Sequence, residues 1–89
     1  MPRYYFHICD DRGFTEDLEG QELPDEQSAR TEAIRGLRDI AAGEMKRGEM
    51  NLGSFIEVED DAHRLVMTVD FADAVRLANE RGIRPRATK

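Results

Sequence analysis

The sequence has little of the covalent or apolar material that stabilises very small proteins. Its 89 residues include no tryptophan and one cysteine. A single cysteine excludes an intramolecular disulfide. No run approaches the roughly 18 apolar residues of a membrane-spanning helix, and the opening Met1-Pro2-Arg3-Tyr4 lacks the apolar segment of a signal peptide. We therefore expect a cytoplasmic protein with one reduced thiol, held together by its core or by a partner.

Positive charge is scarce and unevenly placed. The formal net charge is −6, yet residues 80–89 carry +3 and residues 1–79 carry −9. Because an acidic body repels phosphate, we expect no contact with nucleic acid except through this basic end of the chain. We predict one folded domain over residues 1–79, followed by a basic flexible tail over residues 80–89. The residues of this tail that could touch phosphate or an acidic partner are Arg81, Arg84, Arg86 and Lys89.

Alternating apolar residues predict two pairs of strands. Residues 3–9 alternate with aromatic or aliphatic side chains on both sides, which indicates a central strand. Residues 14–18 are expected to pair back onto it, and residues 21–23 to continue that ribbon. Residues 54–59 and 64–69 alternate on either side of an acidic turn, so they predict a second hairpin.

One long amphipathic helix is predicted between the two hairpins. Asp25 is a suitable N-cap, and Gly48 is a suitable C-terminal cap. Between them, residues 26–47 carry a single apolar stripe at the helical period. A second, shorter helix is predicted over residues 72–79, with Asp70 as its cap.

The order of these elements predicts an α+β fold in which one long helix packs on one face of a four-stranded antiparallel sheet, a ββαββ arrangement with a short C-terminal helix. The side chains expected between sheet and helix are Phe6, Ile8, Ile56, Val58, Leu65, Met67 and Val69 from the strands and Ala33, Leu37, Ile40 and Ala41 from the helix.

The other sheet face is expected to be too apolar for full contact with water. It needs a cover, which is either the short C-terminal helix or a second copy of the chain. The residues predicted to form this interface are Tyr5, His7, Phe55, Val66 and Phe71, mixed with Glu57 and Thr68.

The candidates for chemistry are few. His7 and Cys9 lie two apart on one strand, so with His63 they could bind a soft metal ion, or His7 could activate the thiol of Cys9. The chain has no CxxC or HxxxH spacing for a structural metal, and an extended strand holds the two residues about 7 Å apart. The acidic clusters fit solvated turns, and no glycine-rich phosphate loop is present. We therefore predict no enzyme activity, no cofactor, no metal and no catalytic residue.

Several motifs resemble a family of short uncharacterised bacterial proteins, a domain of unknown function. They are Met1-Pro2-Arg3-Tyr4-Tyr5-Phe6-His7, Asp17-Leu18-Glu19-Gly20, Glu22-Leu23-Pro24-Asp25, Ala29-Arg30, Glu32-Ala33, Ile56-Glu57-Val58 and Val69-Asp70-Phe71-Ala72. The resemblance covers about residues 1–75 and implies no activity, cofactor or catalytic residue. Members of the family tend to have glycine in the last hairpin turn, where this chain has Asp61-Ala62-His63.

Two functions from different classes follow. The first is an interaction or structural module that self-associates, as a homodimer, through the sheet face without the long helix. The second is an antitoxin-like regulatory protein, which binds a protein partner through an exposed edge strand or its tail, or nucleic acid through the tail. The second rests on a similarity of layout alone.

Overall fold

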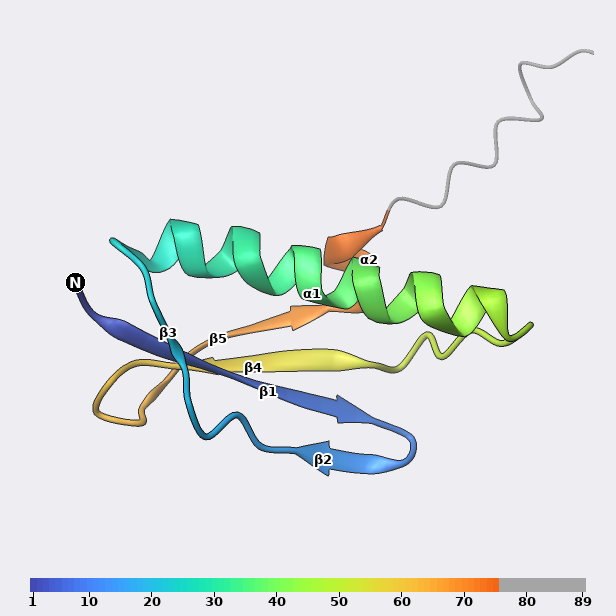
Figure 1. Ribbon diagram of the computed structural model, residues 1–89, viewed down its shortest axis with the longest axis horizontal. Helices are drawn as coiled ribbons and strands as arrows, with labels where there is room; N and C mark the ends of the chain where they lie inside the picture. Colours follow the sequence, from blue (N-terminus) through green and yellow to red (C-terminus); the bar gives the residue numbers. More distant parts are fainter. Residues whose placement is uncertain (76–89) are drawn as a thin grey trace, which may run out of the picture.

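A five-stranded sheet and two helices make up residues 1–75, the part of the chain that this computed structural model describes (Figure 1). In chain order the elements are β1 (Arg3–Asp10), β2 (Gly13–Thr15), β3 (Gln21–Glu22), α1 (Glu26–Lys46), β4 (Phe55–Glu59), β5 (Leu65–Asp70) and α2 (Phe71–Ala74). The predicted α+β fold is confirmed. The predicted tail over residues 80–89, and residues 76–79 of the predicted second helix, lie outside the described residues.

The sheet is antiparallel, with the order β2-β1-β4-β5, and β3 also pairs with β1. β1 is therefore a central strand, as its two apolar sides predicted. β2 pairs with residues 8–10 of β1 and β3 pairs with residues 3 and 4, so both lie along the same edge of β1. The chain between them, residues 16–20, leaves the middle of that edge without a partner strand.

The local signals at the ends of α1 are confirmed. The Asp25 side chain accepts a hydrogen bond from the Ser28 backbone N–H at 2.8 Å, which satisfies one of the unpaired donors of the first turn. At the other end Gly48 has a φ of +81°, the left-handed conformation that commonly ends a helix. The buried stripe between these caps faces the sheet through Ala29, Ala33, Leu37 and Ala41.

The core lies between α1 and one face of the sheet. Leu37, Val58 and Val69 are its largest fully buried side chains. The alternation of β1 and β4 places Tyr4, Phe6, Ile8, Ile56 and Val58 on this inner face, as the register between the two strands requires.

The prediction that Leu65 belongs to this core is wrong. Val58 lies opposite Met67 whereas Glu59 lies opposite Leu65, so β5 has one extra residue, Val66, at this point. Such a bulge shifts the pleat by one residue and inverts the faces on one side of it. Leu65 consequently lies opposite Glu59 and is 57% exposed, while Val66 packs against the core.

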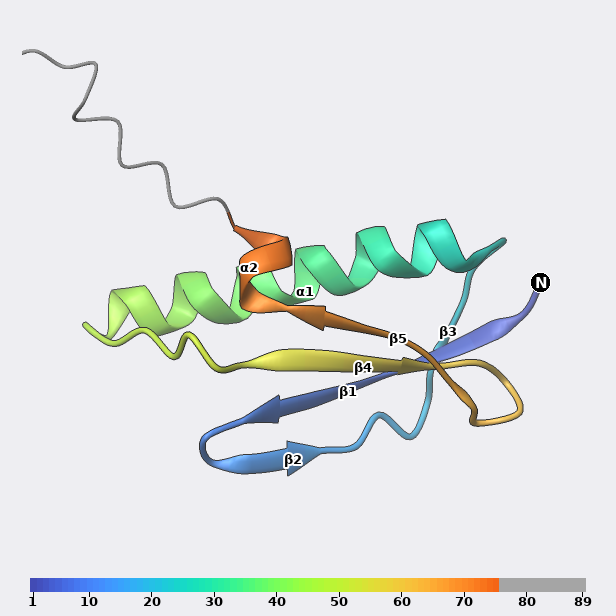
Figure 2. The same cartoon turned by 180° about the vertical axis from the view of Figure 1, so that it is seen from behind.

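The short helix α2 lies beside α1 and does not cover the other face of the sheet. Figures 1 and 2 show both helices on one side of the strands, and the Arg38 Nε donates a hydrogen bond to the Ala74 carbonyl at 2.6 Å. Phe71, at the start of α2, is buried. Among residues 1–75, neither helix has the length and apolar character that a bilayer-spanning segment requires. We call the sheet face away from α1 and α2 the open face.

Candidate functional site

The open face combines aromatic and aliphatic side chains with a polar centre. The strand registers place ten residues on it: Tyr5, His7 and Cys9 from β1, Phe14 from β2, Phe55, Glu57 and Glu59 from β4, and Leu65, Thr68 and Asp70 from β5. Phe14 and Leu65 are each 57% exposed, and Tyr5 and Phe55 are half-buried. Neither described helix covers this face (Figures 1 and 2).

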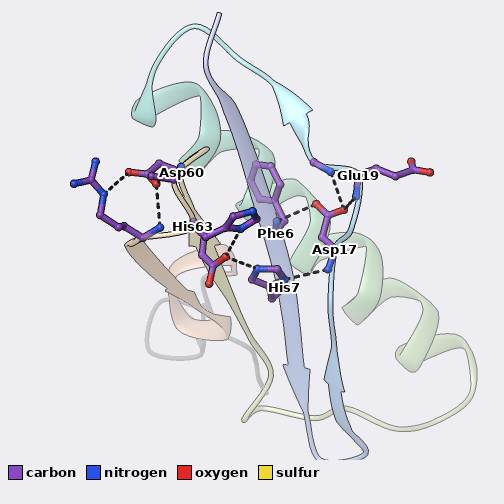
Figure 3. Close-up of polar contacts among 10 residues, drawn as sticks. Phe6, His7, Asp17, Glu19, Asp60 and His63 are labelled. Carbon is purple, nitrogen blue, oxygen red and sulfur yellow. Dashed lines mark hydrogen bonds and ion pairs between the residues drawn. The ribbon is translucent and has the colours of Figure 1, made fainter.

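Four residues on this side of the sheet form one connected set of hydrogen bonds, which we call the His7 network (Figure 3). The Asp17 backbone N–H donates to Nδ1 of His7 at 3.0 Å. Nε2 of His7 lies 3.0 Å from Oε1 of Glu59, and Nδ1 of His63 lies 3.2 Å from the same oxygen. The network thus connects β1 to the loop of residues 16–20 on one side and to the hairpin formed by β4 and β5 on the other.

The hydrogen bonds determine the tautomer of His7. Because Nδ1 accepts a hydrogen bond from the Asp17 backbone N–H, it carries no hydrogen of its own, and the ring N–H is at Nε2. Nε2–H then donates to the Glu59 carboxylate. Both ring nitrogens of His7 are occupied and the residue is 3% exposed, so His7 has no lone pair available to act as a general base.

Asp17 takes the place of a missing strand along the edge of β1. Its Oδ2 accepts from the Phe6 backbone N–H at 3.0 Å, at the point where neither β2 nor β3 pairs with β1. Its Oδ1 accepts from the backbone N–H groups of Glu19 and Gly20, at 3.2 and 3.1 Å. One carboxylate therefore satisfies three backbone donors and fixes the loop against the sheet.

Gly20 permits this loop to approach β1. Its φ is +69°, and a Cβ placed on it would lie 2.8 Å from the Tyr4 carbonyl oxygen. Both the backbone conformation and the lack of space exclude a larger residue without rearrangement. The Asp17-Leu18-Glu19-Gly20 motif therefore has a structural explanation.

Both carboxylates of the network are stabilised in their ionised forms. Burial by itself raises the pKa of Asp17, but hydrogen bonds from the backbone of Phe6, Gly20 and Glu19 outweigh it, so the pKa lies below its ordinary value. Hydrogen bonds from His7 and His63 likewise hold the pKa of Glu59 below its ordinary value. At neutral pH both carboxylates are therefore ionised and accept the hydrogen bonds of the network.

His63 is the strained member of the network. Its φ of +61° is the one positive value among the non-glycine residues of the described chain, and this conformation disfavours most side chains. Its ring stacks on Tyr5 with the centroids 4.5 Å apart and is hydrogen-bonded to Glu59. A glycine would adopt the same conformation without strain, which fits the glycine that the family resemblance leads us to expect in this turn.

Cys9 lies on the open face but takes no part in the network. Burial raises the pKa of its thiol, and the nearby carboxylates of Glu57 and Asp10 raise it further. A thiol with a raised pKa is protonated at neutral pH and is a poor nucleophile. Within residues 1–75, moreover, no three His, Cys, Asp or Glu side chains are placed to hold a metal ion. The described side chains at the centre of this face are held by the hydrogen bonds of the His7 network.

The structure brings together three of the five residues predicted to form an interface. Tyr5, His7 and Phe55 lie on the open face. His7 is nevertheless buried, partly by the Phe14 ring, whose centroid lies 5.5 Å from that of the imidazole. The placement of the other two on this face is wrong. Val66 packs against the core because of the bulge, and Phe71 is buried at the start of α2.

The basic residues predicted to contact phosphate, or the partner of an antitoxin-like protein, lie outside the described residues. These are Arg81, Arg84, Arg86 and Lys89. That second function stays a prediction.

Two residues that the sequence analysis did not connect with His7 are central to the network. Asp17 and Glu59 each lie in an acidic cluster at the end of an expected strand, ten and 52 residues from His7 in the sequence. The one sequence signal for Asp17 was its motif, in which an aspartate precedes a glycine by three residues, a common pattern where a side chain accepts from turn N–H groups. Nothing in the sequence signals the contact with Glu59.

Comparison with known proteins gives a family without an assigned activity. No curated protein matches the chain, and no solved structure matches it. Residues 3–72 match the family described as Domain of unknown function (DUF6894). This range includes the whole sheet, α1 and every member of the His7 network. The chain therefore belongs to the DUF6894 family.

Proposed function

We propose that this protein is a small interaction module that self-associates through its open face. The observation that carries the proposal is that both described helices cover one side of the sheet, while the other side presents Phe14 and Leu65 at 57% exposure beside half-buried Tyr5 and Phe55. Aromatic and aliphatic side chains gathered on one uncovered surface are typical of protein interfaces.

The size of the open face indicates a weak association. The eight residues of β1 extend over about 26 Å and four strands over about 19 Å, which gives a flat footprint of about 500 Å². A standard interface buries about 800 Å² on each partner. We therefore expect association at micromolar concentration or above, in exchange with monomer.

The His7 network supports the proposal because it makes the face rigid before binding. Side chains that are already hydrogen-bonded lose little conformational freedom on association. Electrostatic repulsion opposes the association, because each copy brings the carboxylates of Glu57, Glu59 and Asp70 to the interface. Since salt screens repulsion between exposed charges, added salt is expected to strengthen the association.

The test is the mass of the protein in solution as a function of concentration, measured by light scattering or sedimentation. Phe14→Glu and Leu65→Glu place a carboxylate at exposed positions of the open face and should weaken association about tenfold or more. Met45→Glu is the matched control, because Met45 is 60% exposed but lies on α1. A folded wild type that stays monomeric at every concentration contradicts the proposal, as does equal association by all three variants.

A further inference from the structure

The free edge of β5 is the second unpartnered feature of the sheet. Within residues 1–75, β5 pairs with β4 on one side and with no strand on the other (Figure 2). An edge strand presents backbone N–H and C=O groups that can bind a further strand, and proteins usually block such edges with proline, charge or a covering segment.

The register shows which backbone groups of β5 point outward. The Phe6 N–H points to Asp17, away from β4, so Val58, opposite Phe6, directs its own backbone groups toward β5. Met67 lies opposite Val58 and returns those hydrogen bonds to β4. Thr68, the next residue, must then direct its N–H and C=O to the free edge.

The same alternation continues along β4 and β5. Ile56 shares the orientation of Val58, so Val69, opposite Ile56, points toward β4. Asp70 then points outward like Thr68, and its N–H is already taken by the Asp73 carboxylate at 2.9 Å. The outward N–H that awaits a partner in this regular part of β5 is therefore that of Thr68.

The composition of β5 leaves this edge unprotected. The stretch from Leu65 to Val69 contains no proline, no glycine and no charged residue. The rest of the described chain is strongly acidic, since residues 1–75 carry 18 Asp and Glu against 8 Lys and Arg. The bulge distorts the strand at Val66 but leaves Met67–Asp70 in regular register with β4. Two acidic copies can approach each other at this strand without bringing carboxylates together along its length.

We propose that β5 pairs in antiparallel fashion with β5 of a second copy, about a two-fold axis at Thr68. In this register the Thr68 N–H of each copy donates to the Thr68 C=O of the other. Met67 lies opposite Val69 of the second copy, and both side chains are on the inner face, so the two cores become continuous. The registers shifted by one residue place an inner side chain opposite an outer one and are excluded.

The pairing has a consequence for the open face, and it goes beyond the proposed function. Two sheets joined at β5 form a single sheet whose open faces lie side by side, with a footprint of about 1,000 Å² instead of about 500 Å². The joined surface reaches the size of a standard interface, which the face of one copy does not. The occupant of the edge is therefore a second copy of this chain, and the larger face is available to a further pair.

The first experiment measures amide hydrogen exchange of the full chain by NMR at rising protein concentration. The amides of Met67 and Val69 are protected at every concentration because they bond to β4, whereas that of Thr68 becomes protected only as the copies associate. An exchange rate of Thr68 that does not change with concentration overturns the pairing.

The second experiment compares the solution masses of three variants. Thr68→Pro removes the outward N–H without removing a bond to β4, and Thr68→Lys, at an exposed position, places two positive charges at the two-fold axis. Each should reduce the mass about twofold, whereas Met45→Glu, on α1 and away from both the open face and the β5 edge, keeps the wild-type mass. Thr68→Lys serves as the test if Thr68→Pro does not fold.

The outcomes separate this inference from the proposed function. If the Thr68→Pro and Thr68→Lys proteins keep the wild-type mass, β5 pairing is overturned, whatever Phe14→Glu does. If these two variants lower the mass and Phe14→Glu does not, β5 pairing stands and association through the open face fails. A decrease with both sets supports both contacts, and a monomeric wild type overturns both.

Discussion

Replacement of Asp17 by alanine should destabilise the protein far more than its place in an acidic loop suggests. The substitution removes the acceptor for three backbone N–H groups, those of Phe6, Glu19 and Gly20. Phe6 lies in β1, and its N–H has no partner strand to replace the carboxylate. The substitution therefore leaves a backbone N–H group of the central strand, that of Phe6, without its acceptor.

The expected magnitude follows from the burial of the three donors. A hydrogen bond to a charged acceptor contributes about 1.5–3 kcal/mol when its loss leaves a poorly solvated donor, which applies to Phe6. Water can replace the acceptor for Glu19 and partly for Gly20, so these two bonds add about 0.5 kcal/mol each. The sum of about 2.5–4 kcal/mol is a large fraction of the roughly 4–11 kcal/mol expected for a domain of this size.

The assay is urea unfolding followed by far-ultraviolet circular dichroism, at a concentration fixed for all variants. With a urea slope of about 1 kcal/mol per molar, Asp17→Ala should lower the midpoint by about 2 M or more. Asp17→Asn keeps one acceptor oxygen and places an N–H donor where the other oxygen was, so it should fall between the alanine variant and the wild type.

Asp10→Ala is the matched control for this series. Asp10, the last residue of β1, also accepts from two backbone N–H groups where the chain turns into β2, those of Arg12 and Gly13, but both residues are exposed to water. Its replacement should cost less than about 1 kcal/mol. If Asp17→Ala costs no more than Asp10→Ala, Asp17 does not substitute for a strand and the reasoning is refuted.

Three further predictions concern the same part of the molecule. Gly20→Ala should destabilise the fold by about 1–3 kcal/mol in thermal unfolding, because the new Cβ meets the Tyr4 carbonyl at 2.8 Å; an unchanged melting temperature would contradict the close approach. His63→Val should lower stability by about 1–2 kcal/mol while His63→Gly stays near the wild type, since the φ of +61° penalises a β-branched residue; equal melting temperatures would show that this strain is absent. Because the pKa values of Glu59 and Asp17 are lower in the folded state than in the unfolded chain, stability should be complete above about pH 5 and fall as the pH drops below about 4; urea midpoints that rise on acidification would contradict this sign.

Much of the fold could be predicted because its signals are local. The apolar stripe between Asp25 and Gly48 predicted α1 to within a residue of its observed end, since helical period and capping depend on neighbours in the chain. The two-sided apolar character of residues 3–9 predicted a central strand. Alternation also predicted the inner set of β1 and β4, because the two faces of a strand are separated by a period of two.

The errors and omissions arise where contacts join distant segments. Alternation could not show the extra residue in β5, which a bulge opposite Val58 and Glu59 introduces, so Leu65 and Val66 exchanged faces. Nor could it show that α2 packs beside α1, because a helix this short takes its position from its neighbours rather than from its own sequence.

The sequence by itself determined the helix, the strands, the acidic turns and the apolar character of both sides of β1. The tertiary structure alone decided that Asp17, His7 and Glu59 meet, since hydrogen bonds between residues ten and 52 positions apart exist only once strands are paired in one register. It also decided which sheet face the two described helices leave uncovered, and which strand of the described chain lies at the end of the sheet. These properties depend on strand order and pairing, which result from competition among all the chain's contacts and leave no local pattern in the sequence.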